Sequence, residues 1–313
     1  MKNQVRIGTR GSQLALWQAN YIKGRIKTAF PETQVEITII KTTGDRITDR
    51  PLAMVGGKGL FVKEIETALM ENRIDLAVHS MKDMPGELPP GLTIGAIPER
   101  ENPFDILISG SGKALSDYPQ GAVIGTSSLR RGSQLKHARP DLEIKSIRGN
   151  LDTRVKKLKA GDYDAIVLAA AGLRRLGQEN EITEYLTEDT MVPAVGQGAL
   201  CIETRENDPD MAPIMEALDH EPTRVCVEGE RAFLKQIEGS CHIPVACFGK
   251  IEDDQVLLTA IVASEDGQEV IKERIASPAG DVIENGRKLA EQLLENGGKR
   301  ILENLESNDT TQG

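Results

Sequence analysis

The chain has 313 residues, 39% of them hydrophobic and only ten aromatic, which suffices for two or three domains with cores built mainly from Leu, Ile, Val and Ala. No apolar run approaches the roughly 20 residues of a membrane span, and the net charge of −10 argues against a general nucleic-acid binder. Residues 1–7 enter a strand-like segment without the apolar stretch of a signal peptide, so we expect a soluble, cytoplasmic protein.

Positive charge is concentrated in one part of the chain. Residues 125–175 contain twelve Lys or Arg and five Asp or Glu, a local balance of +7, so the remainder carries −17. A basic segment inside an otherwise acidic protein suggests a pocket for small polyanions, because an acidic exterior would repel a DNA backbone.

The chain opens with a strand at 5–8, and a turn at 9–13 leads into a helix that extends through Ile26. Ser12 is a candidate N-cap for this helix. A glycine-containing turn before a helix N-terminus favours anion binding, and Arg10 adds a guanidinium there. A solvated arginine in an ordinary turn is the alternative.

A second strand is predicted at 35–40 by its β-branched alternation. Between 42 and 60 charges and glycines replace any periodicity, and the spacing of a phosphate-binding P-loop is absent. We expect either a mobile lid, to which Lys58 and Phe61 contribute, or an ordinary surface loop.

The most informative stretch is DLAVHSMKDMP at 75–85. Its apolar run at 76–78 predicts a buried strand, and Pro85 forces the chain to turn soon afterwards. Lys82 and Asp83 are therefore expected beyond the carboxyl end of a strand, where open α/β sheets bind ligands. A surface turn with an ordinary ion pair is the alternative.

Strand ends that carry arginine recur in the basic segment. A strand at 123–125, a Gly-Thr-Ser turn and a helix repeat the pattern of residues 5–16, and two further turns follow. Arginine binds carboxylates through two parallel hydrogen bonds, which suits a polyanionic ligand. The candidate anion-binding residues of the segment are Thr126, Ser128, Arg130, Arg131, Arg148, Arg154 and Arg175.

Polar, proline-containing connectors at 98–103 and 190–198 suggest that the chain leaves a first domain and returns to it. This predicts two α/β lobes with a cleft between them. A helix at 226–237, strands at 256–263 and 269–275 and a helix at 280–296 predict a small α+β domain, with a disordered tail from Ser307. The expected domains are 1–98 with 199–217, 103–192, and 218–313.

The four cysteines, Cys201, Cys226, Cys241 and Cys247, form no C-x-x-C pair, so neither a disulfide framework nor a metal site is expected. Cys241 lies in a Gly-Ser-Cys turn, where a thiol can be exposed and reactive. For the other three we expect buried, inert side chains.

Several long motifs, in order along the chain, resemble those of the porphobilinogen deaminase family, also called hydroxymethylbilane synthase. The motifs are GTRGSQLA at 8–15, VGGKGLF at 55–61, AVHSMKD at 77–83, GTSSLRR at 125–131, RGN at 148–150, AAGL at 170–173 and PAVGQG at 193–198. The resemblance implies two lobes like those of type II periplasmic binding proteins, a third domain, and a monomer.

The resemblance also implies the reaction. The family joins four porphobilinogen molecules head to tail on a dipyrromethane cofactor, which by motif position is attached to Cys241 through a thioether. Each step releases ammonia and builds positive charge on pyrrole nitrogens, which the carboxylate of Asp83 would stabilise.

The acetate and propionate groups of each pyrrole would bind to cationic and polar residues. By motif position these are Arg10, Ser12, Lys82, Thr126, Ser128, Arg130, Arg131, Arg148, Gly149, Arg154, Arg175 and Gln197. We expect Arg130, Arg131 and Arg154 on the cofactor side and Arg10, Arg148 and Arg175 on the substrate side. The chain departs from the family pattern at Ser240, often Gly, and at Met54, often Lys.

Two other functions compete with this one. A non-catalytic carboxylate-binding protein could use the same cleft, and a hydrolase or transferase could use Cys241 as nucleophile with His242 or His79. An adduct about two pyrroles heavier than the bare chain would separate the deaminase from both.

Overall fold

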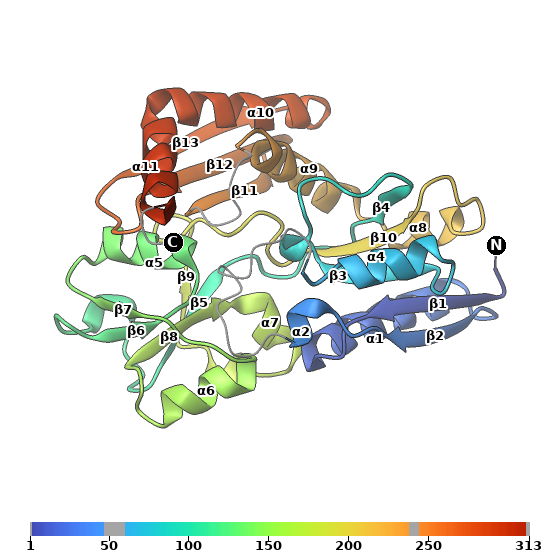
Figure 1. The fold of residues 1–313 in the computed structure, drawn as a ribbon, viewed down its shortest axis with the longest axis horizontal. Coiled ribbons are helices and arrows are strands. Elements are labelled where there is room, and N and C mark those ends of the chain that lie inside the picture. Colours follow the sequence, from blue (N-terminus) through green and yellow to red (C-terminus); the bar gives the residue numbers. More distant parts are fainter. Residues whose placement is uncertain (1, 47–59, 238–243, 311–313) are drawn as a thin grey trace. The chain divides into compact units, whose positions relative to one another are not determined.

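The computed structural model describes residues 2–46, 60–237 and 244–310, which contain three β-sheets with their helices (Figure 1). The chain divides into two compact units, Met1–Glu101 with Ala199–Val225 and Asn102–Gly198 with Cys226–Gly313. The first unit contains one five-stranded sheet, and the second contains the other together with a three-stranded sheet. The predicted class, two α/β lobes with a small C-terminal sheet domain, is confirmed.

The first sheet has the order β2-β1-β3-β10-β4, in which β10 alone is antiparallel to its neighbours. On one face of the sheet, Ile22 of α1 and Ile214 of α8 share a core with Val78 of β3. On the other face, Ile65 of α4 shares a core with Ala77 of β3. Its elements are β1 (Gln4–Thr9), α1 (Gln13–Ala29), β2 (Gln34–Ile39), α2 (Thr43–Arg46), α4 (Lys63–Met70), β3 (Leu76–Ser80), β4 (Leu92–Ala96), β10 (Leu200–Arg205) and α8 (Ala212–Leu218).

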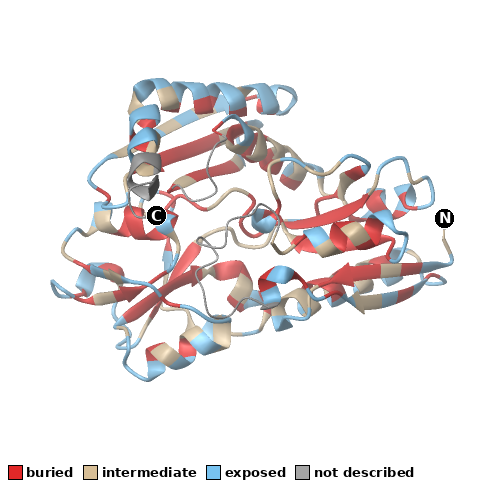
Figure 2. Ribbon diagram, in the orientation of Figure 1, coloured by how far each residue is buried: buried red, intermediate tan, exposed pale blue. Residues whose placement is uncertain are grey.

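The second sheet, β7-β6-β8-β5-β9, has the same arrangement, because β5 is antiparallel to β8 and β9. In each lobe the antiparallel strand is the first one formed after a connector. The central strand β8 reads AIVLA and is buried on both faces (Figure 2), with Val167 towards α5 and Ile166 towards α6 and α7. The elements are β5 (Asp105–Ser109), β6 (Val123–Gly125), α5 (Leu129–Ala138), β7 (Glu143–Lys145), α6 (Leu151–Lys159), β8 (Ala165–Ala169), α7 (Ala170–Arg175) and β9 (Glu184–Leu186).

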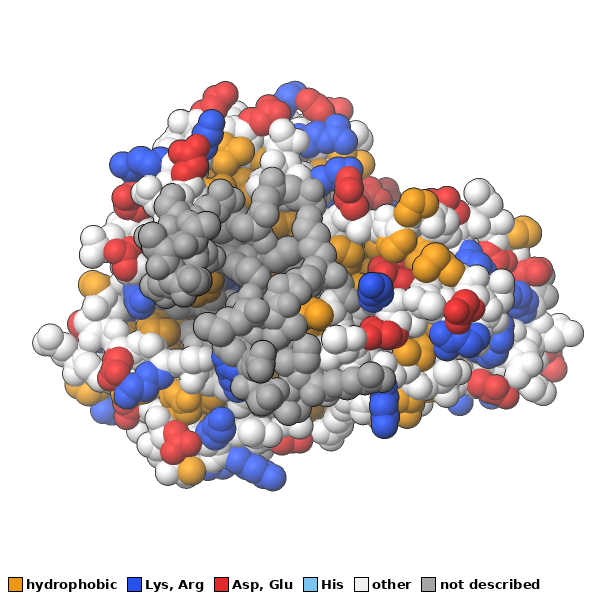
Figure 3. Space-filling model, in the orientation of Figure 1, with side chains coloured by type: hydrophobic (Ala, Val, Ile, Leu, Met, Phe, Trp, Pro, Cys, Tyr) orange, Lys and Arg blue, Asp and Glu red, His pale blue; other side chains and the backbone are white. Residues whose placement is uncertain are grey.

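The C-terminal part is an antiparallel meander with helices α9, α10 and α11. Phe248 and Ile261 pack against Phe104 and Val192, which flank the connectors. On the face in Figure 3 both acidic and basic side chains are visible. Within α10, Glu284 forms ion pairs with Arg287 and Lys288. The elements are α9 (Glu221–Gln236), β11 (Val245–Glu252), β12 (Gln255–Ala263), β13 (Val270–Ser277), α10 (Val282–Leu293) and α11 (Lys299–Thr310).

The predicted disorder from Ser307 is wrong as far as Thr310, because α11 extends to that residue. Polar composition alone suggested a tail, but helix propagation adds one backbone hydrogen bond per residue and needs no apolar side chain at the end.

A buried carboxylate ties the start of β3 to β1. The side chain of Asp75 is 1% exposed and accepts hydrogen bonds from Lys2 Nζ at 2.8 Å and from Arg6 Nε at 3.0 Å. Burial alone raises the pKa of Asp75, but the bonds from Arg6 and Lys2 lower it to about 2.

Asp75→Asn should therefore lower the free energy of unfolding at pH 7 by about 2–3 kcal/mol, since one pKa unit corresponds to about 1.4 kcal/mol. The folded pKa lies below the unfolded value of about 3.9, so this stabilisation is complete above about pH 5 and is lost as the pH falls towards 2. Urea unfolding at pH 7 and pH 3 measures the difference, with exposed Glu32→Gln as control. Equal losses at both pH values would contradict the prediction.

Candidate active site

Lys82 and Asp83 lie on a single 3-10 turn, η1 (Met81–Asp83), directly after β3. Their side chains are exposed, whereas Met81 and Met84 are 1% and 5% exposed and anchor the turn in the core. The N–H of Met81 also donates to the Ala199 carbonyl at 3.0 Å, which continues the pairing of β3 with β10. Within the described residues the Asp83 carboxylate has no hydrogen bond or ion pair, so it is available to a ligand N–H.

Arg10 already binds a carboxylate of the protein itself. Its Nε donates to Asp45 Oδ1 at 3.0 Å, Nη2 contacts the same oxygen, and the guanidinium lies 4.0 Å from the centroid of the Phe61 ring. Burial raises the pKa of Asp45, but the hydrogen bonds from Arg10 and Thr42 outweigh it and hold the pKa below its ordinary value. The sequence did not single out Asp45, because one acid in a charged loop carries no pattern.

Ser12 caps α1 as predicted, since its Oγ accepts the N–H of Ala15 at 3.3 Å. Two turns into the helix, the buried Gln18 donates from Nε2 to Ser80 Oγ at 2.9 Å. This bond joins α1 to the end of the strand that carries Lys82 and Asp83. Sequence reasoning missed Gln18, because its partner is 62 residues away.

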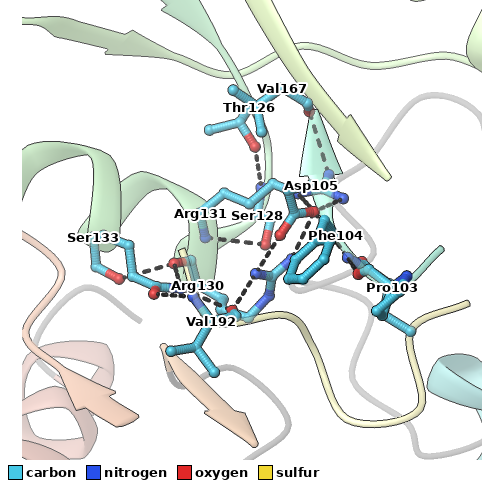
Figure 4. A network of polar contacts seen from close by, with 12 residues as sticks. Pro103, Phe104, Asp105, Thr126, Ser128, Arg130, Arg131, Ser133, Val167 and Val192 are labelled. Atoms are coloured by element: carbon cyan, nitrogen blue, oxygen red, sulfur yellow. Dashed lines mark hydrogen bonds and ion pairs between the residues drawn. The ribbon is translucent and has the colours of Figure 1, made fainter. Parts of the chain in front are cut away.

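In the second unit, Arg130 and Arg131 both bind Asp105 (Figure 4). Asp105 Oδ2 accepts Arg130 Nη1 at 2.7 Å, and Oδ1 accepts Arg131 Nε at 2.8 Å and Gln197 Nε2 at 3.0 Å. Arg130 Nη1 also donates to the Val192 carbonyl at 2.8 Å. The two arginines are 7% exposed and Asp105 is fully buried.

The charges of this network do not cancel, because two guanidinium groups share one carboxylate. Burial raises the pKa of Asp105, but the charges of Arg130 and Arg131 hold it far below its ordinary value. Burial and the charge of Arg130 lower the pKa of Arg131, against the opposing effect of Asp105, yet a guanidinium stays protonated in proteins. The group therefore carries a net charge of about +1, which favours an anionic ligand.

The N-terminus of α5 adds polar groups beside these arginines. Ser128 is its N-cap and accepts the N–H of Arg131 at 3.4 Å, and Thr126 Oγ1 accepts the N–H of Ser128 at 3.2 Å. The predicted hydroxyl residues Thr126 and Ser128 thus lie at the start of the helix that carries Arg131 (Figure 4).

The RGN motif forms the cap of α6. Gly149 has a φ of +117°, and a Cβ there would lie 2.6 Å from Thr153 Cγ2, so a glycine is required. Arg154 Nε donates to the Gly149 carbonyl at 2.9 Å. Burial, and then the charge of Arg131, lower the pKa of Arg154, so these two guanidinium groups are neighbours. Arg148 is exposed.

The PAVGQG connector forms hydrogen bonds with residues from several parts of the second unit. Gly196 and Gly198 adopt left-handed backbone angles, with φ of +68° and +87°. Arg175 is buried and donates to the Gly198 carbonyl at 2.7 Å, and Gln197 donates to the Pro103 carbonyl at 2.7 Å. The fully buried Glu230 of α9 accepts the N–H of Gly196 at 2.6 Å and that of Gly249 at 2.8 Å. Sequence reasoning missed Glu230, which links the connector to β11.

The predicted residues thus fall into two sets. Arg10, Ser12, Phe61, Lys82 and Asp83 belong to the first unit, and the residues from Thr126 to Gln197 belong to the second. Cys241 and Lys58 lie outside the described residues. Cys201, Cys226 and Cys247 are buried, as expected.

Comparison with known proteins decides the family. The model of the porphobilinogen deaminase dipyrromethane cofactor binding domain matches residues 5–213, and that of the porphobilinogen deaminase C-terminal domain matches residues 224–295. The chain belongs to the porphobilinogen deaminase family. It is 51% identical over 298 residues to the porphobilinogen deaminase of Geotalea uraniireducens, covering 95% of this chain and 93% of the relative. It is also 51% identical over 300 residues to that of Geobacter sulfurreducens, covering 96% and 94%.

Similar solved structures include the methionine-binding protein MetQ, with a TM-score of 0.41, 14% identity and coverage of 69% of this chain and 90% of that one. A substrate-binding domain of an amino acid transporter from Streptococcus pneumoniae has a TM-score of 0.44 and 12% identity, with 69% and 91% coverage. Likenesses this weak carry no argument about function.

The donor set fits a dipyrromethane of this family. Each pyrrole carries two carboxylate arms, and the surplus charge of the Asp105 network, together with Arg154, offers guanidinium groups that pair with carboxylates in two-point contacts. Within the described ranges no cluster of three His, Cys, Asp or Glu is suited to a metal ion, and no helix is both long and apolar enough to cross a membrane.

Asp105→Asn should lower the free energy of unfolding by about 3 kcal/mol or more, because it leaves two buried guanidinium groups without their counter-charge. Thermal and urea unfolding measure the loss, and intact mass shows whether the cofactor is still attached. Asp162→Asn, on an exposed loop of the same lobe, is the matched control. An unchanged melting temperature in Asp105→Asn would show that the network does not stabilise the lobe.

Proposed function

We propose that the protein condenses four porphobilinogen molecules on a dipyrromethane held by Cys241, with Asp83 as the catalytic carboxylate, and then releases linear hydroxymethylbilane by hydrolysis. Family membership over nearly the whole chain supports the reaction. One structural observation carries the choice of residue. Asp83 presents an exposed carboxylate between two buried methionines, without a partner among the described residues.

Asp83 acts on the positive charge that develops when the amine of the porphobilinogen aminomethyl group leaves as ammonia and its methylene carbon stays on the pyrrole. The electron deficiency spreads to the pyrrole nitrogen, whose N–H the carboxylate accepts. A fixed negative charge stabilises that cation more than the neutral substrate, which lowers the barrier. The same side chain, once it has taken up a proton, can pass that proton to the departing amine.

The cationic residues hold carboxylate arms. Arg130, Arg131 and Arg154 lie together and suit the cofactor, whose terminal pyrrole supplies the α-carbon that the first substrate joins. Arg10, Arg148 and Arg175 are proposed for substrate and the growing chain, together with Lys82. Arg10 must then share its guanidinium with Asp45 or release it when a substrate carboxylate binds.

The remaining proposals concern organisation. We propose three domains, 1–98 with 199–217, 103–192 and 218–313, in a cytoplasmic monomer that has no nucleic-acid partner. The net charge of −10 supports the last point, since a phosphate backbone would be repelled.

The alternatives are not favoured. A simple carboxylate-binding protein does not require the C-terminal family domain that matches residues 224–295. A hydrolase with His79 as base is disfavoured by the side chain itself, because its ring is 4% exposed and bonded to Glu203.

Asp83→Asn should retain fold and cofactor but lose about 10²–10³-fold in kcat, because the amide cannot supply the negative charge that stabilises the cation. Steady-state assays of hydroxymethylbilane formation measure it. A kcat within a few-fold of wild type would remove Asp83 from the chemistry. Asp117→Asn, outside both residue sets, controls for the loss of one charge.

Cys241→Ala should be isolated at the mass of the bare chain, whereas wild type should carry an adduct of about two pyrroles. Intact-mass spectrometry of both proteins measures the difference. Cys226→Ala changes a buried cysteine of α9 and should keep the adduct. An adduct that survives in Cys241→Ala would place the attachment on another residue.

A further inference from the structure

Three titratable side chains outside the proposed chemistry lie together between α4 and the first sheet. His79 on β3 and Glu203 on β10 have side chains 4% and 0% exposed, and His79 Nε2 lies 3.0 Å from Glu203 Oε2. Glu66 lies on the buried face of α4 and is 6% exposed.

Two carboxylate oxygens of this group, Glu66 Oε1 and Glu203 Oε1, are buried without a hydrogen-bond partner among the described residues. Two ionised carboxylates in an apolar layer would repel each other and lack water. Burial, and then the negative charge of Glu203, raise the pKa of Glu66, while His79 opposes them. Glu66 therefore keeps its proton to a higher pH than an exposed glutamate does.

The surrounding charges are engaged elsewhere. Arg205 of β10 donates to two carbonyl groups at and beyond the end of α4, both at 2.9 Å. Asp75 binds cations near the N-terminus, and Glu64 accepts from the N–H of Thr43 at 2.8 Å. The charge of the cluster is thus set mainly by Glu66, His79 and Glu203 themselves.

The cluster lies directly before the candidate catalytic turn. His79 is the penultimate residue of β3, four positions before Asp83. In the antiparallel register His79 lies opposite Cys201, so its contact with Glu203 is a diagonal one between β3 and β10. Both side chains lie on the face of the sheet that α4 covers. Together with the bond from Met81 N–H to the Ala199 carbonyl, this contact fixes the end of β3 to β10.

We propose that Glu66, His79 and Glu203 form one electrostatically coupled cluster, and that this cluster positions Lys82 and Asp83 in a pH-dependent way. The inference rests on the proposed role of Asp83. While Glu66 is protonated, it lies beside Glu203 without repulsion. As the pH rises through the raised pKa of Glu66, a second negative charge forms there, α4 and β10 repel each other, and the end of β3 loosens.

Glu66→Gln tests this, because an amide resembles the protonated carboxyl but does not titrate. In wild type kcat should fall with rising pH in a step that is absent or moved to higher pH in Glu66→Gln, and the melting temperature should follow the same pattern. Glu71→Gln makes the same chemical change at the exposed end of α4 and should leave both profiles as in wild type. Superimposable profiles of wild type and Glu66→Gln would overturn the inference.

Magnetic resonance gives a readout independent of activity. The ¹⁵N signals of His79 can be assigned by their loss in His79→Gln. In wild type they should move with pH in a step that is missing in Glu66→Gln. Identical behaviour in wild type and Glu66→Gln would overturn the inference. A measurement on wild type by itself should also show one glutamate ¹³C carboxyl signal that titrates above the ordinary pH range of glutamate. The test therefore does not depend on the folding of Glu66→Gln. The absence of such a signal would count against the cluster.

Asp83→Asn separates this inference from the proposed function. It leaves the cluster intact, so the His79 signals should respond to pH as in wild type although activity is lost. If Asp83→Asn keeps full activity, the proposed function fails, while the magnetic resonance result still decides the cluster.

Discussion

A single carboxylate, removed from water, organises the arginine site of the second unit. Asp105 accepts hydrogen bonds from Arg130, Arg131 and Gln197, and none of these residues is more than 7% exposed. Electrostatic interactions are strong there because little solvent screens them. The carboxylate can neutralise only one of two guanidinium groups, so the network is held together internally while still attracting an anion.

The first unit also contains an arginine paired with a carboxylate of the protein, but this pair is more exposed to solvent. Arg10 is held by Asp45 on one side and by the ring of Phe61 on another, with Arg10 and Asp45 about one quarter exposed. A guanidinium fixed in this way loses less conformational entropy when a ligand binds. Under the proposed function, a substrate carboxylate would compete with Asp45 for this guanidinium.

Local patterns predicted the elements well where one residue type decides the outcome. A continuous apolar run predicted β3, the Ser12 side chain predicted the start of α1, and Pro85 predicted the turn after Asp83. Partners distant in sequence could not be predicted, because Asp105, Gln18 and Glu230 are ordinary polar residues until the fold brings their partners to them. The family motifs supplied Cys241 and Asp83 without any geometry.

Asp83 and the arginine network differ in mechanical compliance. Asp105 and its partners are locked by charged hydrogen bonds that tolerate little displacement. The turn with Asp83 is instead seated on Met81 and Met84, whose unbranched thioether chains fill irregular space and repack readily. Small excursions of the carboxylate therefore cost less than any shift of the arginines. Under the function proposed above, the stiff arginine network would anchor the cofactor, and the compliant turn would let Asp83 follow the growing end.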